Sequence, residues 1–357
     1  MDTQSKLVLN NILSTTAEQK ASDLHLSVGS PPTLRMNGQL IPLKGEEIIT
    51  KEFMEEFTEE ILDEGQREQL QKEKELVFAY QHQKQARFRV NIFYQKKVLA
   101  AYLRLIGDRI IPLEQLGLPT ALYDLAQLRE GLLLISGVFG SGKTTTSASI
   151  LEYINEHRSA YILTIERPIE YIFQNRKSIV EQREIGRDAI SFEHALSSIT
   201  QEDVNVLFLS EVTSPSVIKQ ALTIAASGRL VIANVEADTT MRTLELILNS
   251  FSSVEQGQIR QQLSLNLAAT ICQRLIPKIG GGQVAVAEIM RMIPPIQSNI
   301  REGSLHQINN IIQTSRAEGM VSLDWSLAEL VKSNQILPED ALKHSNDPQQ
   351  LQYMLQT

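Results

Sequence analysis

The sequence predicts an α/β protein in which a small α+β domain precedes a domain built on a mostly parallel sheet. The first hundred residues end in two stretches that alternate as strands do, at 86–93 and 98–105. Further on, short apolar runs at 131–136, 161–165, 206–209 and 230–233 alternate with helical patterns. Strands that alternate with helices form a parallel sheet covered by helices on its faces.

The composition fits two globular domains and argues against nucleic-acid binding. The chain has 357 residues, 42% of them hydrophobic, and a formal net charge of -8. This charge would repel a phosphate backbone, and an aromatic share of 5% supplies few stacking platforms. A single cysteine, Cys272, indicates a reducing compartment. We expect a cytoplasmic protein, because there is no signal-peptide pattern at the start and no apolar run of 18 residues to span a membrane.

The first domain is expected over residues 1–106. The stretch 7–13 is typical of an amphipathic helix. The charged segment 46–76 predicts surface helices with one buried stripe that includes Phe53, Phe57 and Ile61. Glycines and prolines then recur, which predicts a linker at 107–119 and a second domain over 120–357.

In the second domain the strand at 131–136 should lead into a helix over 144–157. A further helix should begin after Ser214, which suits an N-cap, and stop at Gly228. From Val254 onward we expect a mostly helical part. The polar last dozen residues, from Ser345, are expected to fray.

A phosphate-binding loop lies between the first of these strands and its helix. It reads Gly137-Val138-Phe139-Gly140-Ser141-Gly142-Lys143-Thr144, followed by Thr145. The glycines allow backbone N–H groups to converge on phosphates, Lys143 reaches the β and γ oxygens, and the Thr144 hydroxyl ligates Mg²⁺. The positive end of the helix dipole adds to this attraction. The loop therefore predicts a site for ATP and Mg²⁺.

Two carboxylates are expected beside this loop. Glu211 follows the buried strand 206–209, and Glu166 ends the strand 161–165. Both should reach the carboxyl edge of the sheet, where ligands bind in open α/β folds. Each could order a water or a metal-bound ligand. The residues alone leave open which of the two activates water.

Several further strings, in the same order along the chain, resemble those of the type IV pilus retraction ATPases, the PilT family of the secretion ATPase superfamily. In the first half they are Ala21-Ser22-Asp23-Leu24-His25-Leu26-Ser27 and Ala86-Arg87-Phe88-Arg89-Val90-Asn91. In the second half they are Thr164-Ile165-Glu166, Gln182-Arg183-Glu184-Ile185-Gly186, Ile300-Arg301-Glu302-Gly303 and Gln313-Thr314. The resemblance runs almost from end to end.

The resemblance implies a PAS-like first domain and a RecA-like ATPase domain, assembled as a homohexamer that turns against an inner-membrane platform protein at the cytoplasmic face. It also implies that Arg87, Arg89 and Arg104 approach the phosphates, where a guanidinium neutralises developing charge. The alternative is that these are surface arginines on strands.

The chain departs from the family pattern near the chemistry. Arg167 follows Glu166 where the family has Asp, Asn205 and Ser210 replace Asp and Gly, and Val212-Thr213-Ser214 replaces Met-Arg-Asp. Arg229 and Glu236 stand where the family has two histidines. A carboxylate facing a phosphate is repulsive, whereas Arg167 and Arg229 could act as new cations.

We therefore expect ATP binding with weakened hydrolysis. One hypothesis is a motor ATPase that powers or assists pilus retraction. The other is an ATP-binding scaffold subunit with vestigial catalysis, in a ring of its own or mixed with an active paralogue. A RecA-like translocase on nucleic acid is disfavoured by the acidic charge.

Overall fold

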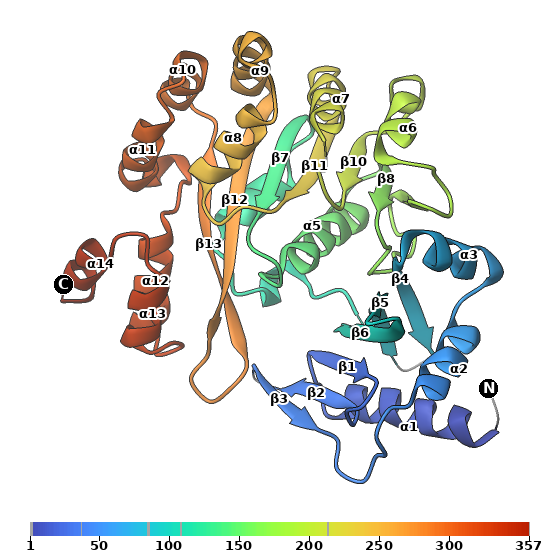
Figure 1. Ribbon diagram of the computed structural model, residues 1–357. Coiled ribbons are helices and arrows are strands. Elements are labelled where there is room, and N and C mark those ends of the chain that lie inside the picture. The colour runs from blue at the N-terminus through green and yellow to red at the C-terminus, as the bar shows by residue number, and fades with distance from the viewer. Residues whose placement is uncertain (1–2, 37, 84–85, 108, 213, 357) are drawn as a thin grey trace. The chain divides into compact units, whose positions relative to one another are not determined.

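The computed structural model describes residues 3–36, 38–83, 86–107, 109–212 and 214–356, and the chain forms two compact units (Figure 1). The first unit comprises residues 1–109 together with 167–172. The second comprises residues 110–166 and 173–357. Residues 167–172 therefore interrupt the second unit in sequence but belong to the first. The sequence pattern did not predict this exchange. The predicted α/β class is confirmed.

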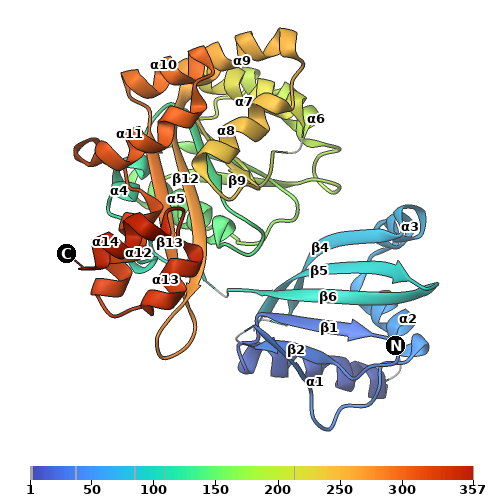
Figure 2. The ribbon, with the colours of Figure 1, turned by 60° about the vertical axis from the view of Figure 1, so that its left-hand side comes forward.

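The first unit is an antiparallel sheet with helices on one face. Its elements are α1 (Thr3–Glu18), β1 (Asp23–Ser27), β2 (Thr33–Met36), β3 (Gln39–Pro42), α2 (Lys51–Ile61), α3 (Glu64–Glu73), β4 (Glu75–His82), β5 (Ala86–Gln95) and β6 (Val98–Ile106). The strand order is β3-β2-β1-β6-β5-β4. Residues of α1, α2 and α3 share one apolar core with these strands. Figure 2 shows the strands of this unit side by side.

Alternation along β5 explains which side chains reach that core. Phe88, Val90 and Ile92 are buried, whereas Arg87 and Arg89 on the other face are half-exposed. Successive side chains of a strand point to opposite faces, so the two arginines share the face away from the core. The predicted stripe of the helices is also present, because the buried residues of α2 recur at helical spacing.

The second unit carries a seven-stranded sheet. Its elements up to the last strand are η1 (Leu113–Gln115), α4 (Ala121–Ala126), β7 (Gly131–Ser136), α5 (Lys143–His157), β8 (Tyr161–Glu166), β9 (Ile179–Glu184), α6 (Phe192–Ser197), η2 (Ile199–Gln201), β10 (Val206–Leu209), α7 (Pro215–Ala226), β11 (Leu230–Val235), α8 (Thr240–Asn249), α9 (Ser253–Asn266), β12 (Leu267–Pro277) and β13 (Gln283–Arg291). After the sheet come α10 (Pro294–Glu302), η3 (Leu305–Gln307), α11 (Ile308–Thr314), η4 (Arg316–Glu318), α12 (Leu323–Lys332), α13 (Pro338–His344) and α14 (Pro348–Gln356).

The strand order of this sheet is β13-β12-β7-β11-β10-β8-β9, and every neighbouring pair is parallel except β12 with β13. Helices α4 and α5 pack on one face, and α6 to α11 cover the other (Figure 1). Because parallel strands end at one edge, the segments that follow β7, β8, β10 and β11 share that edge. We call it the carboxyl edge.

Most residues from Val254 onward are helical, as expected, but the expectation missed two strands. After α9, residues 267–291 form the β12–β13 hairpin, which extends the sheet beside β7. The apolar run that opens β12 is buried on both faces. Such a strand shows no alternation, so its periodicity does not separate it from a buried helix.

The expected fraying of the last residues was also wrong for 345–356, whereas Thr357 lies outside the described residues. Residues 348–356 form α14, whose Leu351 is buried against α12 and α13. The Asp324 carboxylate accepts hydrogen bonds from the Ser345 hydroxyl and from the backbone N–H groups of Asn346 and Asp347. This capping holds the turn that leads into the last helix.

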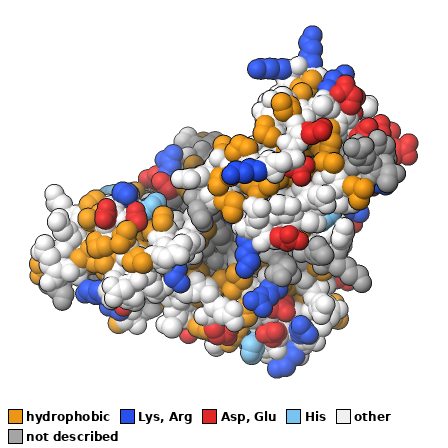
Figure 3. Space-filling view, turned by 90° about the horizontal axis from the view of Figure 1, so that it is seen from below, with side chains coloured by type: hydrophobic (Ala, Val, Ile, Leu, Met, Phe, Trp, Pro, Cys, Tyr) orange, Lys and Arg blue, Asp and Glu red, His pale blue; other side chains and the backbone are white. Residues whose placement is uncertain are grey.

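No helix of the described ranges combines the length and the apolar character needed to cross a membrane. On the face seen in Figure 3, acidic and basic side chains are interspersed.

Candidate nucleotide-binding site

The predicted phosphate-binding loop connects the buried strand β7 to α5. Gly140 and Gly142 adopt left-handed backbone angles, with φ of 78° and 88°, which glycine adopts without strain. Two glycines of the loop also leave no room for a side chain. A Cβ on Gly137 would lie 2.2 Å from Ser141 Oγ, and one on Gly142 would lie 2.7 Å from Gln273 Nε2. The loop is therefore a cradle whose backbone shape depends on glycine.

Lys143, Thr144 and Thr145 form the first turn of α5. The N–H groups of a first helical turn have no partner within the helix, and they attract anions together with the helix dipole. The Lys143 ammonium lies over the loop and donates to the carbonyls of Gly137, at 2.8 Å, and Val138, at 3.0 Å. The Lys143 cation therefore lies at the loop, against its first two carbonyls.

Glu166 lies at the carboxyl edge, as the last residue of β8. It is buried, and its Oε1 accepts hydrogen bonds from Thr164 Oγ1 at 2.6 Å and from Gln182 Nε2 at 3.0 Å. These bonds fix the orientation of the carboxylate. A fixed carboxylate at this edge is suited to orient a water or a nucleotide-bound cation.

Glu211 lies in the segment after β10 and is half-exposed. Its neighbours anchor this segment on both sides. Ser210 N donates to Ile165 O of β8 at 3.0 Å, and Val212 N donates to Asn234 O of β11 at 3.1 Å. Glu211 therefore lies between the ends of β8 and β11. Thr213, which follows, lies outside the described residues.

The strand order ranks the two carboxylates by their separation from the loop. With neighbouring strands about 4.8 Å apart, β10 lies roughly 10 Å from β7 and β8 roughly 14 Å from it, because two and three strand spacings separate them. Glu211 follows the nearer strand, whereas Glu166 is the more firmly held. Both therefore remain candidate site residues.

The two positions where the family has histidines lie at opposite ends of β11. One is at the carboxyl edge, and the other is at the edge where the parallel strands begin, which we call the far edge. Glu236 directly follows β11, the neighbour of β7, and is exposed at the carboxyl edge. Arg229 directly precedes β11, and its guanidinium donates to the carbonyls of Val204 and Glu202, both at 3.0 Å. Arg229 therefore does not supply a new cation to the cradle, because it closes loops at the far edge.

Asn205 lies at the far edge as well. Its Oδ1 accepts from Tyr161 N at 2.8 Å, and its carbonyl accepts from Leu230 N at 3.1 Å, so it joins the starts of three strands. Of the described departures from the family pattern within the second unit, those that lie at the carboxyl edge are Ser210, Val212, Ser214 and Glu236. Arg167 belongs to the first unit.

The three predicted arginines lie on β5 and β6 of the first unit. Arg87 Nη2 donates to Ile169 O at 2.7 Å, and Arg89 Nη1 pairs with Glu170 Oε1 at 3.0 Å. Both thus hold the segment 167–172, which continues the chain from Glu166. Arg104 Nε instead pairs with Asp23 Oδ1 at 2.9 Å.

Asp23 is buried, and its partners Tyr102 and Arg104 are half-buried. Burial opposes the charge of Asp23, but hydrogen bonds from the Tyr102 hydroxyl and from Arg104 outweigh it and lower the pKa of Asp23. Burial and the bond to Asp23 raise the pKa of Tyr102 to about 12. Arg104 is therefore part of a structural network of the first unit.

Sequence reasoning missed two glutamines that act on the site through other residues. Gln182 on β9 orients Glu166, and Gln273 on β12 contacts the loop and α5. In the sequence, each glutamine could be noticed only as a polar residue within a strand or an apolar run. That signal says nothing of its partner, which is distant in the sequence.

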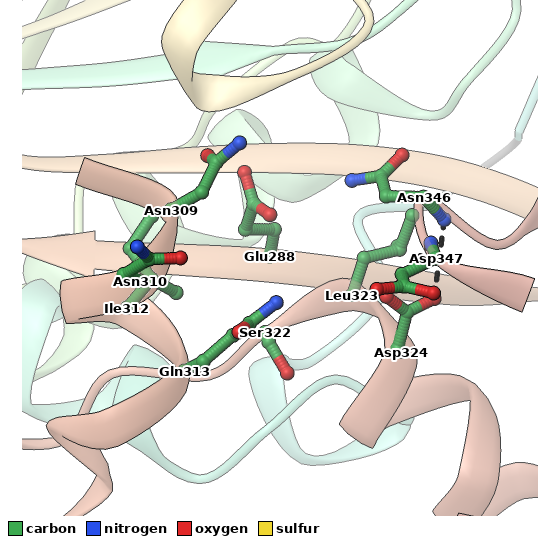
Figure 4. Close-up of a pocket in the computed structure, with 10 residues that line it drawn as sticks. All are labelled: Glu288, Asn309, Asn310, Ile312, Gln313, Ser322, Leu323, Asp324, Asn346 and Asp347. Atoms are coloured by element: carbon green, nitrogen blue, oxygen red, sulfur yellow. Dashed lines mark hydrogen bonds between the residues drawn. The ribbon is translucent and has the colours of Figure 1, made fainter. Parts of the chain in front are cut away.

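A separate polar cavity of about 220 Å³ lies between β13, α11, α12 and the turn before α14 (Figure 4). Its lining residues are Glu288, Asn309, Asn310, Ile312, Gln313, Ser322, Leu323, Asp324, Asn346 and Asp347. None of these belongs to the phosphate-binding loop. Burial raises the pKa of Glu288, whose Oε1 accepts from Thr240 N at 3.1 Å. This carboxyl adds to the N-cap of α8, Thr239, whose side chain accepts from Arg242 N.

A parallel sheet with a glycine-rich cradle at a helix start, and carboxylates at the same edge, defines a P-loop nucleotide-binding protein. Comparison with known proteins narrows this class. Residues 2–317 match the family described as Type II/IV secretion system protein. The chain belongs to this family of secretion ATPases.

Individual relatives agree over nearly the whole length. The type IV pilus retraction ATPase PilT of Pseudomonas aeruginosa is 35% identical, over 96% of this chain and 99% of its own. The type IV pilus ATPase PilU of the same organism is 34% identical, over 96% of this chain and 90% of its own. A crystal structure of the pilus retraction motor PilT with bound ADP superposes with a TM-score of 0.84 at 36% identity, covering 96% of this chain and 98% of that one.

Proposed function

We propose that this chain is an ATP-binding motor subunit of a type IV pilus machine, which powers or assists pilus retraction and so twitching motility. The observation that carries the proposal is the glycine cradle closed by Lys143 at the start of α5. The similarity to a retraction ATPase over 96% of the chain supports the same function. ATP is the ligand that such a cradle fits.

The loop residues would hold ATP and Mg²⁺ as follows. The backbone N–H groups of the loop and Lys143 bind the phosphates, and the Thr144 hydroxyl binds Mg²⁺. Bound Mg²⁺ neutralises phosphate charge. Glu166 and Glu211 orient the attacking water, and arginines of the first domain stabilise developing charge. All three arginines already have partners in the first unit: Arg87 donates to Ile169 O, Arg89 pairs with Glu170, and Arg104 pairs with the buried Asp23.

The assembly we propose is a homohexamer at the cytoplasmic face of the inner membrane, where it works against a platform protein. In such a ring the nucleotide lies at subunit interfaces, so that arginines carried by one domain couple hydrolysis to motion. A ring mixed with a paralogue is the alternative assembly.

Hydrolysis in this chain should be weak. Glu236 is exposed at the carboxyl edge beside the loop strand. A carboxylate close to the γ-phosphate repels it by up to several kcal/mol, roughly, where water and metal do not intervene. This observation favours the second candidate function, an ATP-binding scaffold subunit whose catalysis is vestigial and whose partner is an active paralogue.

The two candidates are separated by steady-state ATP hydrolysis measured beside ATP binding, for the wild-type chain and for Glu236→His. We expect wild-type turnover well below about 1 per second, the lower end of ordinary kinase-like rates. Glu236→His should raise turnover about tenfold or more, which corresponds to about 1.4 kcal/mol of barrier, with ATP affinity unchanged.

Arg229→His is the matched control, because it restores the other family histidine at the far edge of the sheet. It should leave turnover unchanged. Wild-type turnover of about 1 per second or more would rule out weakened hydrolysis. Equal gains from both histidine variants would show that Glu236 does not act through its place at the cradle.

A further inference from the structure

Gln273 is a buried side chain on β12 beside the phosphate-binding loop. Cys272 pairs with Ser136, the last residue of β7, so the next residue of β12 lies beside the start of the loop at Gly137. The Gln273 side chain is 2% exposed. A buried amide must satisfy both its donor and its acceptor, and this requirement makes its partners informative.

Both partners belong to the loop and its helix. Gln273 Nε2 donates to Ser141 O at 2.8 Å, and Gln273 Oε1 accepts from Thr146 Oγ1 at 2.6 Å. The amide thus joins the loop backbone to the first turns of α5. Gln273 also packs closely against Gly142, because a Cβ added to Gly142 would lie 2.7 Å from Gln273 Nε2.

Fixing the Ser141 carbonyl also fixes the next N–H group. The carbonyl of Ser141 and the N–H of Gly142 belong to one planar trans peptide unit, so they point in opposite directions. With the carbonyl turned toward Gln273 and the sheet, the Gly142 N–H is turned away from them. An N–H that is turned away from the protein in this way is free of Gln273 and can join a cradle of N–H groups for an anion.

We propose that Gln273 is a positioning residue for nucleotide binding, which holds the Ser141–Gly142 peptide unit so that the Gly142 N–H meets a phosphate oxygen. This inference rests on the proposed nucleotide binding at the loop. Glutamine suits the position because one group must donate to a carbonyl and accept from a hydroxyl. Neither a carboxylate nor an apolar side chain does both.

The test is the affinity for MgATP and MgADP by titration calorimetry, together with the melting temperature, for wild type, Gln273→Met and Thr146→Val. Gln273→Met keeps the volume but removes both hydrogen bonds. Thr146→Val is the matched control, since it removes the bond to Oε1 and leaves the bond to Ser141 O intact. We expect Gln273→Met to weaken affinity about tenfold or more, the equivalent of about 1.4 kcal/mol.

Thr146→Val should lower the melting temperature to a similar extent, with an affinity within about twofold of wild type, or about 0.4 kcal/mol. A purely structural role of Gln273 would instead move both variants alike. If Gln273→Met does not fold, Gln273→Leu replaces it. That variant also lacks both the donor and the acceptor, so it too should weaken nucleotide affinity.

The outcomes separate this inference from the proposed function. If wild type binds nucleotide and Gln273→Met or Gln273→Leu binds equally well, the positioning role is overturned while nucleotide binding stands. If wild type binds neither nucleotide, the proposed function fails and this inference fails with it.

Discussion

Single residues of the phosphate-binding loop could be assigned from the sequence because each satisfies a local backbone requirement. The left-handed angle of Gly142 and the start of α5 at Lys143 are such requirements. Gln273 could not be assigned in this way. Its partner Ser141 is 132 residues away, and no local pattern links a buried amide to a distant carbonyl.

The carboxylate of Asp23 gives a prediction at the same scale. Asp23→Asn should lower the free energy of unfolding by about 1–3 kcal/mol at neutral pH, because Tyr102 and Arg104 lose a charged acceptor. Chemical denaturation of both chains at several pH values measures the difference.

The pH dependence has a definite sign. The folded state lowers the pKa of Asp23 below its ordinary value of 3.8. Its stabilisation is therefore complete above that value and is lost as the pH falls through the pKa of the folded chain. The gap between wild type and Asp23→Asn should close in strong acid. A gap that stays constant with pH would contradict the assignment.

Whole helices and strands could be predicted where residues typical of an element's start or end mark it in the sequence. Ser214 and Pro215 mark the start of α7, and the structure has this N-cap and this first turn. The β12–β13 hairpin could not be predicted, because its strands are buried on both faces and lack alternation. The N-cap of α8 is the local residue Thr239. The bond from Thr240 N to Glu288 of β13 could not be predicted, because its partners are distant in the sequence.

The Glu288 carboxyl makes the start of α8 pH-sensitive. Burial raises the pKa of Glu288 above its ordinary value of 4.5, with Thr240, Arg274 and Asp324 acting on it as well. A raised carboxyl pKa gives stability that is complete below the pKa of the unfolded chain and is lost as the pH rises through that of the folded chain. Glu288→Gln should remove this loss, because the amide oxygen still accepts from Thr240 N.

We expect Glu288→Gln to be at least as stable as wild type at pH 7, with a flatter dependence of the unfolding free energy on pH. Glu288→Ala is the control. It lacks the acceptor and should lose about 1 kcal/mol, as other lost helix caps do. Greater stability of wild type than of Glu288→Gln at pH 7 would show that the charged form is the one the fold requires.

At the scale of the whole chain, the fold class and the family were both predictable, because motifs matching one family occur in order from the first domain to α11. The division of the chain into two units was predicted only in part. Residues 167–172 belong to the first unit and are bound there by Arg87 and Arg89. The segment that follows Glu166 therefore connects the candidate site to the first unit. The sequence showed the residues of this segment but not their partners.

The central claim for the whole molecule is that the loop from Gly137 to Thr144 binds ATP. Titration of the wild-type chain and of Lys143→Ala with MgATP tests it most directly, with Lys219→Ala as a control lysine that pairs with Glu255 elsewhere in the unit. We predict one ATP per wild-type chain, the same affinity in Lys219→Ala, and a loss of about tenfold or more in Lys143→Ala, since a charged hydrogen bond contributes roughly 1.5–3 kcal/mol. Equal ATP affinity in wild type and Lys143→Ala would contradict the account.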